Sequence, residues 1–151
     1  MNYGIYFDSA TSADAVREAL QTVYGIAPSL VYVGPYENLA GHPGPDPVAL
    51  VVPAGGQFGH ELSAGDRLAE LTGQNELELA RSLCRVAGCR ALVDDGSPAP
   101  DYWFLVAEDG SYGRVETDAD ADGLTVRHAL EPIAGAPDLI VQPPPDWART
   151  W

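Results

Sequence analysis

The chain has 151 residues, of which 46% are apolar, which is enough for one domain with a substantial buried core. Its net charge is −14, from 22 acidic and 8 basic residues, and all of these basic residues are arginine. The absence of lysine excludes a Walker A loop, a lysine Schiff base and a kinase-type ATP lysine, and the negative charge disfavours nucleic acid and favours a cationic partner.

The first part of the chain predicts three strands and one helix. Residues 3–9 and 29–33 have the composition of short strands. Residues 12–25 predict an amphipathic helix, because apolar residues recur at helical spacing and a glycine stands at the end. After a loop rich in glycine and proline, the apolar run 48–52 predicts a central strand that is covered on both faces.

The middle of the chain predicts two consecutive helices. The first is short and ends near Thr72, and Gly73 separates it from a longer second helix. Asn75 and Glu78 have the spacing of a variant capping box at the start of that second helix. We expect Gly88 to end it.

The last part of the chain predicts further strands. Residues 90–95 predict a strand, and residues 101–118 predict a hairpin that turns at Asp109 and Gly110. Residues 124–130 predict another strand and residues 138–142 a last one.

This order of elements predicts the fold class. Strands that cluster in runs favour an α+β domain with a mainly antiparallel sheet and two to three helices packed on one face. We expect a single domain over residues 1–142 and an extended tail over residues 143–151, in which Trp147 and Trp151 either dock on the domain or contact a partner. We expect no signal peptide and no membrane segment, and therefore a cytoplasmic protein with two reduced thiols.

An acidic motif before the predicted strand at 124–130 resembles the start of a calcium loop. Asp118, Asp120 and Asp122 alternate and are followed by Gly123, as in an EF-hand. The bidentate carboxylate expected at loop position 12 is missing, because that position is Ala129, and the flanking residues alternate as strands do. An acidic turn is the favoured interpretation, with weak calcium binding as the alternative.

The two consecutive helices also have the outline of a helix-turn-helix motif. The recognition helix would lie within residues 74–86, but Glu76 and Glu78 stand near its start, where contacts with bases are made. A DNA-binding regulator therefore stays a lesser alternative. The favoured interpretation is a helical hairpin that buries apolar residues, namely Leu68, Leu71, Leu77, Ala80 and Cys84.

No catalytic motif can be assigned from the sequence. The segment 60–64 lacks the second histidine of an H-E-x-x-H zinc motif, and the histidines are scattered. Cys89 has Arg85 and Arg90 nearby, which could lower its pKa, but no base partner is identifiable. We therefore expect no enzyme activity, no cofactor and no metal, with a metal-assisted enzyme as the alternative.

Aromatic and acidic residues alternate between residues 94 and 112. On a strand, Tyr102 and Phe104 share one face and Trp103 lies on the other. Exposed aromatic residues that are surrounded by charge are typical of binding hot spots. The predicted contacts with a basic protein partner are Asp94, Asp95, Asp101, Tyr102, Trp103, Glu108, Asp109 and Tyr112.

Residues 78–110 combine a helix, Gly-Cys-Arg, a strand ending in Asp-Asp, a Ser-Pro-x-Pro turn, an aromatic strand and Asp-Gly. This pattern resembles small acidic actinobacterial immunity proteins of polymorphic toxin systems. The resemblance implies an α+β domain that inhibits a cognate toxin enzyme, such as a nuclease or a nucleic-acid deaminase. Inhibition would come from blocking the cationic active-site cleft, with carboxylates in the place of substrate phosphates.

Overall fold

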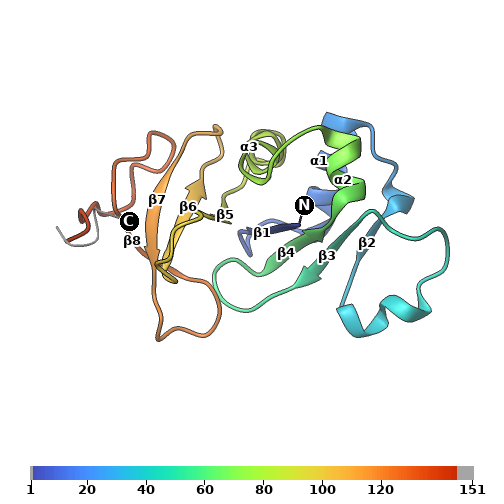
Figure 1. Cartoon of the computed structure of the whole chain (residues 1–151), viewed down its shortest axis with the longest axis horizontal. Helices are drawn as coiled ribbons and strands as arrows, with labels where there is room; N and C mark the ends of the chain where they lie inside the picture. Colours follow the sequence, from blue (N-terminus) through green and yellow to red (C-terminus); the bar gives the residue numbers. More distant parts are fainter. Residues whose placement is uncertain (1, 146–151) are drawn as a thin grey trace.

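The computed structural model describes residues 2–145 of the chain. It contains one eight-stranded sheet with the strand order β2-β3-β4-β1-β5-β6-β7-β8 (Figure 1). Neighbouring strands are antiparallel except β2 and β3, which are parallel. The strands are β1 (Tyr3–Phe7), β2 (Val31–Val33), β3 (Ala49–Pro53), β4 (His60–Ala64), β5 (Ala91–Asp94), β6 (Tyr102–Val106), β7 (Tyr112–Thr117) and β8 (Val126–Ala129).

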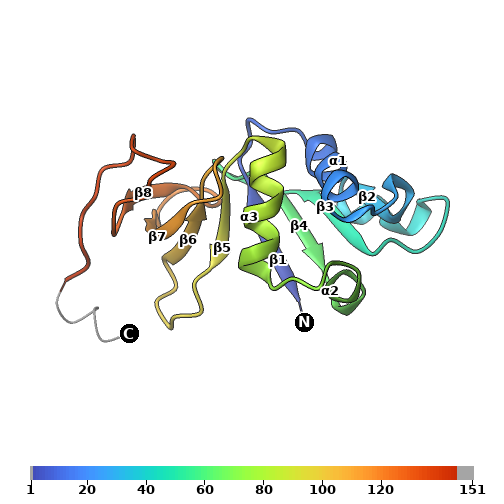
Figure 2. The same cartoon turned by 90° about the horizontal axis from the view of Figure 1, so that it is seen from above.

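The three α-helices pack together on one face of this sheet. They are α1 (Ala13–Tyr24), α2 (Asp66–Thr72) and α3 (Glu76–Ala87). The chain also forms two short 3-10 helices, η1 (Pro28–Leu30) and η2 (Tyr36–Gly41). Figure 2 shows that β7 and β8 extend past the helices on one side. The predicted α+β class, with a mainly antiparallel sheet and helices on one face, is confirmed.

The ends of the two long helices are set by local capping interactions. The side chain of Ser12 accepts a hydrogen bond from Ala15 N at the start of α1. The side chain of Asn75 accepts one from Glu78 N at the start of α3. Gly25 and Gly88 adopt the left-handed conformation that ends each helix, as the sequence predicts.

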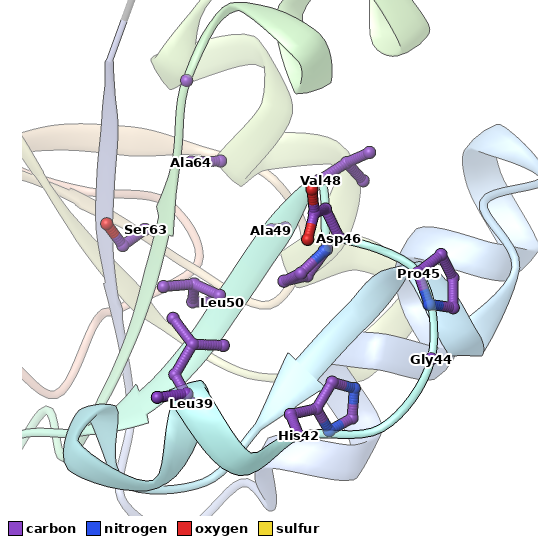
Figure 3. A pocket seen from close by; sticks show the side chains of 13 residues that line it. Leu39, His42, Gly44, Pro45, Asp46, Val48, Ala49, Leu50, Ser63 and Ala64 are labelled. Carbon is purple, nitrogen blue, oxygen red and sulfur yellow. The ribbon is translucent and has the colours of Figure 1, made fainter.

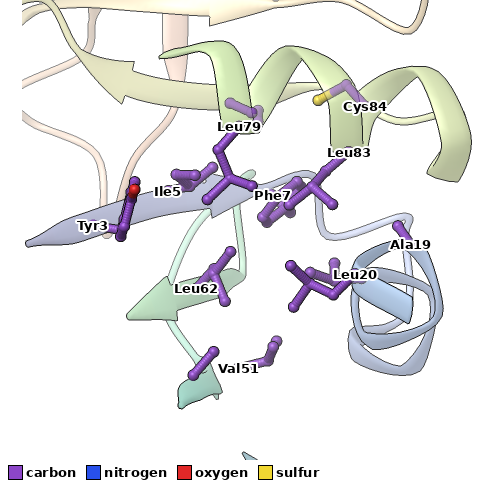
Figure 4. Packing of buried hydrophobic residues seen from close by; sticks show 14 of the residues in the cluster. Tyr3, Ile5, Phe7, Ala19, Leu20, Val51, Leu62, Leu79, Leu83 and Cys84 are labelled. Carbon is purple, nitrogen blue, oxygen red and sulfur yellow. The ribbon is translucent and has the colours of Figure 1, made fainter. Parts of the chain in front are cut away.

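Two large apolar cores lie on opposite faces of the sheet, and a small third cluster contains Ala99, Tyr102 and Leu130. The larger core packs β1, β3 and β4 against the helices, and Figure 4 shows Phe7 and Leu62 facing Leu20 and Leu83 there. The smaller core lies on the other face, beneath loops and the segment that follows β8, and it contains Phe58, Leu92, Leu105, Ala107, Val115, Ala129, Ile133 and Ala136. Because successive strand residues point to opposite faces, β5 contributes to both cores.

Some predicted elements differ from the observed ones. The sequence does not predict β4, which pairs with both β1 and β3. The prediction that β3 is covered on both faces is wrong, because Ala49 and Val51 are buried while Leu50 and Val52 remain partly exposed. The predicted last strand at 138–142 is reduced to one isolated bridge of Val141.

One residue of α2 that the sequence predicts in the core is exposed. Leu71 is 52% exposed, so the prediction that it is a core residue of the helical hairpin is wrong. Within residues 2–145, none of the helices has the length and apolar character needed to cross a bilayer. Trp147 and Trp151, for which the sequence predicts docking or partner contact, lie outside the described residues.

Candidate functional site

The predicted partner contacts lie at two opposite ends of β6. Asp94 and Asp101 lie at the end where β6 begins, at the bottom of Figure 1. Glu108 and Asp109 lie in the turn that follows β6, at the top of that view. A strand of this length spans roughly 17 Å, so the structure does not bring the acidic residues into one patch.

The acidic residues of the β6–β7 turn are engaged within the chain. Arg90 donates a hydrogen bond to Glu108 Oε1 over 3.2 Å. The carboxylate of Asp109 accepts hydrogen bonds from Ser111 N at 2.9 Å and Ser111 Oγ at 2.6 Å. These hydrogen bonds from Ser111 are the main reason why the pKa of Asp109 is lowered. Both acids therefore have roles in stabilising the turn.

Asp95 is buried in a network of its own. Its side chain is 1% exposed, and its Oδ2 accepts hydrogen bonds from Arg114 Nε at 3.1 Å and Nη2 at 2.9 Å. Its Oδ1 accepts hydrogen bonds from Ser97 N at 2.9 Å and Ser97 Oγ at 2.7 Å. The same guanidinium lies 5.4 Å from the centroid of the buried Tyr102 ring. Asp95 and Tyr102 are thus parts of the interior.

The other two predicted aromatic anchors lie on different faces of the sheet. Trp103 is partly buried against Tyr6, with the ring centroids 5.8 Å apart in an edge-to-face arrangement. Tyr112 is 42% exposed and packs edge-on against Phe104. The guanidinium of Arg81 lies 5.0 Å from the centroid of the Tyr112 ring. Of the predicted aromatic anchors, Tyr112 is therefore the one that a partner can reach most easily.

Five aspartates stand at the end of β5, directly before β6 and in the turn that follows β7. Thr117 N donates to the carbonyl of Asp101 over 2.8 Å, which places the turn after β7 beside the start of β6. No described arginine forms an ion pair with these side chains. We call this group the acidic end, and it consists of Asp94, Asp101, Asp118, Asp120 and Asp122.

Each arginine of the described residues has an acceptor within the chain, although Arg127 is 65% exposed and lies 3.9 Å from Glu116. Arg81 Nε donates to Gly110 O over 2.8 Å, and Arg85 Nε donates to Asp109 O over 3.4 Å. These contacts turn the two bases of the proposed recognition helix toward the protein rather than toward a DNA backbone. The arginines with a carboxylate or carbonyl acceptor are Arg17, Arg67, Arg81, Arg85, Arg90, Arg114 and Arg127.

The glycine of the acidic turn is required by a crossing of two backbone segments. Gly123 has a φ of 74°, and a Cβ there would lie 2.2 Å from the carbonyl carbon of Gly55. The next residues form a bridge between Gly56 and Leu124. In residues 2–145, no three histidine, cysteine, aspartate or glutamate side chains are grouped as a metal site would need. The turn is thus built around backbone contact.

Glu76 occupies the place where β1 and β5 separate. The two strands pair only at Tyr6 and Phe7, and the carboxylate of Glu76 accepts a hydrogen bond from Gly4 N over 2.8 Å. Burial is the main cause that raises the pKa of Glu76, and the charge of Asp94 adds to it, while the hydrogen bond from Gly4 opposes the rise. In the sequence, Glu76 has only the position of a residue near the start of a recognition helix.

Replacing Glu76 by glutamine should flatten the dependence of stability on pH. Because the pKa of Glu76 is higher in the folded state, its contribution to stability is complete below its unfolded pKa and is lost as pH rises through the folded pKa. The amide still accepts from Gly4 N but carries no charge. We expect the variant to gain up to about 1 kcal/mol over the wild type at about pH 7 and nothing at about pH 3, since the half-buried group is partly screened.

Urea unfolding of both proteins at several pH values measures this difference. A wild-type protein whose free energy of unfolding stays parallel to that of Glu76→Gln across the same pH range would contradict the prediction.

A pocket of about 550 Å³ lies between the loop that contains η2 and the strands β3 and β4 (Figure 3). Its polar side chains are those of His42, Asp46 and Ser63. His42 packs edge-on against Tyr32 with ring centroids 5.0 Å apart. Among the described residues, no hydrogen bond joins Ser63 to His42 or His42 to Asp46, so the pocket lacks the linked nucleophile and base of a hydrolytic site.

No protein-family model matches the chain, and no curated protein or solved structure matches it with significance.

Proposed function

We propose that the chain is a cytoplasmic, non-enzymatic inhibitor of a cationic protein. In its specific form, the proposal is an immunity protein that covers the active-site cleft of a cognate toxin, such as a nuclease or a nucleic-acid deaminase. Enzymes of these classes bind polyanionic substrates, so their clefts carry positive charge that an acidic surface can oppose.

One observation carries this proposal. Each described arginine has a carboxylate or a carbonyl acceptor within the chain, whereas the described arginines form no ion pair with the five aspartates of the acidic end. In a chain with a net charge of −14, these five aspartates are available to an oppositely charged partner. A surface field of one sign raises the association rate with an oppositely charged surface and selects against acidic or neutral partners.

The acidic end keeps part of the predicted contact set. Asp94 and Asp101 belong to it, and the exposed Asp120 and Asp122 extend it. Asp95, directly after Asp94 in the chain, has a buried side chain that forms an ion pair with Arg114. We propose that partner binding is centred here, with the β6–β7 turn at most a secondary contact.

An affinity experiment with charge variants tests the proposal. The tagged chain captures proteins from a lysate of its host at low salt, a salt step releases them, and mass spectrometry identifies them. We expect a basic enzyme at a 1:1 ratio, whose activity the purified chain inhibits. The variant Asp120→Asn plus Asp122→Asn should weaken binding of that enzyme about tenfold or more by calorimetry.

A matched control separates local contact from general charge. The variant Glu18→Gln plus Glu37→Gln removes the same charge at exposed positions in the N-terminal part of the chain. It should change the affinity less than about twofold. Equal weakening by both variants would exclude the acidic end as the contact, and a captured partner that is not inhibited would exclude the inhibitor function.

A further inference from the structure

The two cysteines of the chain meet at the carboxyl end of α3. Gly88 has a φ of 65°, and its N–H donates to the carbonyl of Cys84 over 2.8 Å. Cys89 N donates to the same carbonyl over 3.3 Å. The second hydrogen bond is that of a Schellman cap, in which the residues at the two ends of the bond also bring their side chains into contact.

The two side chains are buried together. Cys84 is 0% exposed and Cys89 is 3% exposed, and neither forms a disulfide in the structure. The two thiols lie beside each other in the larger core, and the hydroxyl of Thr11 lies beside Cys89. The first of these contacts is the main cause that lowers the pKa of Cys89 and raises that of Cys84.

The arginines that the sequence places beside Cys89 act elsewhere. Arg85 donates to Asp109 O, and Arg90 donates to Asp138 over 2.6 Å and 3.1 Å. The prediction that these arginines lower the pKa of Cys89 is therefore wrong. The contact with the thiol of Cys84 is the main cause that lowers it. The signal for this contact in the sequence is the helix-ending glycine directly before Cys89, with Cys84 five positions upstream.

We propose that Cys84 and Cys89 are a redox modification site that forms a reversible intramolecular disulfide. The thiolate of Cys89 attacks one oxygen of a peroxide, the O–O bond breaks, and Cys89 becomes a sulfenic acid. Cys84 then attacks the Cys89 sulfur, its thiol proton joins the departing hydroxide as water, and the S–S bond forms. With hydrogen peroxide, two electrons leave the two thiols, and the peroxide is reduced to two waters.

The geometry favours an internal bond over other products of oxidation. A disulfide needs Cα atoms roughly 4.4–6.8 Å apart with their Cβ atoms facing, and the cap hydrogen bond holds these two backbones side by side with the thiols in contact. The bond would tie the end of α3 to the start of β5. Arg90 follows Cys89 directly in the sequence. The disulfide would therefore also restrain the arginine that binds Glu108 and Asp138.

Trypsin digestion gives a direct test, because arginines flank both cysteines. Full-length protein is treated with hydrogen peroxide or diamide, blocked with iodoacetamide and digested. We expect residues 82–85 and 86–90 to be released as one linked species, and the intact protein to lose about 2 Da without taking up iodoacetamide. The oxidised protein should melt about 5 °C higher, and dithiothreitol should reverse both changes.

The variants Cys84→Ala and Cys89→Ala serve as controls. Each should lose the linked species and the rise in Tm on oxidation, while the wild-type digestion remains decisive if either variant folds poorly. Three outcomes with folded wild-type protein would overturn the proposal. In the first, both thiols remain reduced after oxidant treatment, so that iodoacetamide labels them once the protein is unfolded. In the other two, the main product is an intermolecular dimer or a sulfinic acid.

Discussion

Replacing Asp95 by alanine is expected to lower the free energy of unfolding by about 3 kcal/mol. The carboxylate is 1% exposed and accepts hydrogen bonds from Arg114 and from Ser97. Its removal would leave the guanidinium of Arg114 over the Tyr102 ring without its counter-charge. Breaking a buried ion pair on one side costs roughly 3–5 kcal/mol, and the 27% exposure of the Arg114 side chain favours the low end of that range.

The neighbouring residue provides the control. Asp94 is exposed, and its carboxylate accepts one hydrogen bond, from Gly96 N over 2.9 Å. Asp94→Ala should therefore cost under about 1 kcal/mol. Urea unfolding followed by tryptophan fluorescence measures both values, and equal losses would contradict the assignment of Asp95 to the interior. The result also shows why a binding experiment must leave Asp95 unchanged.

The elements that the sequence predicts well are those that local interactions determine. The caps of α1 and α3 depend on Ser12, Asn75 and the glycines that follow each helix, and all of these are visible within a few residues. The hairpin at Asp109 and Gly110 is similarly local. These signals suffice to predict the α+β class.

β4 could not be predicted because its position in the sheet depends on its partners. Its sequence, His60–Ala64, has one buried apolar side chain, that of Leu62. The strand is held by pairing with β1 on one side and β3 on the other. Strand propensity reflects such packing more than the intrinsic preference of the residues, so a short polar strand leaves little signal in the sequence.

The same limit applies to the candidate site. Aspartates look alike in the sequence, yet their surroundings in the fold differ. Asp95 forms a buried ion pair with Arg114, 19 residues away, whereas Asp94 is exposed. The carboxylate of Glu108 accepts a hydrogen bond from Arg90, and that of Asp109 accepts hydrogen bonds from Ser111. Composition predicts that the chain is acidic. Tertiary pairing determines which carboxylates form an ion pair with an arginine, and the five aspartates of the acidic end form none with the described arginines.

Gly123 is the second position at which a single substitution should have a large effect. Gly123→Ala is expected to destabilise the protein by about 3 kcal/mol, from two costs. A non-glycine residue in the left-handed region costs roughly 1–2 kcal/mol, and inserting a methyl group into a packed contact costs roughly 1–3 kcal/mol more. The second cost arises because the new Cβ would meet the backbone of Gly55, which has no flexible side chain to move aside.

Gly96→Ala separates the two costs. Gly96 has a φ of 76°, close to the 74° of Gly123, but nothing lies within 4 Å of a Cβ at that position. Its substitution should cost only about 1 kcal/mol. Urea unfolding of both variants measures the difference, which isolates the collision with Gly55. Equal losses would mean that the turn can move away from Gly55, and the glycine of the acidic motif would then be required for its conformation alone. A larger loss at Gly123 would mean that the crossing of the two segments, and not the left-handed conformation alone, requires the glycine.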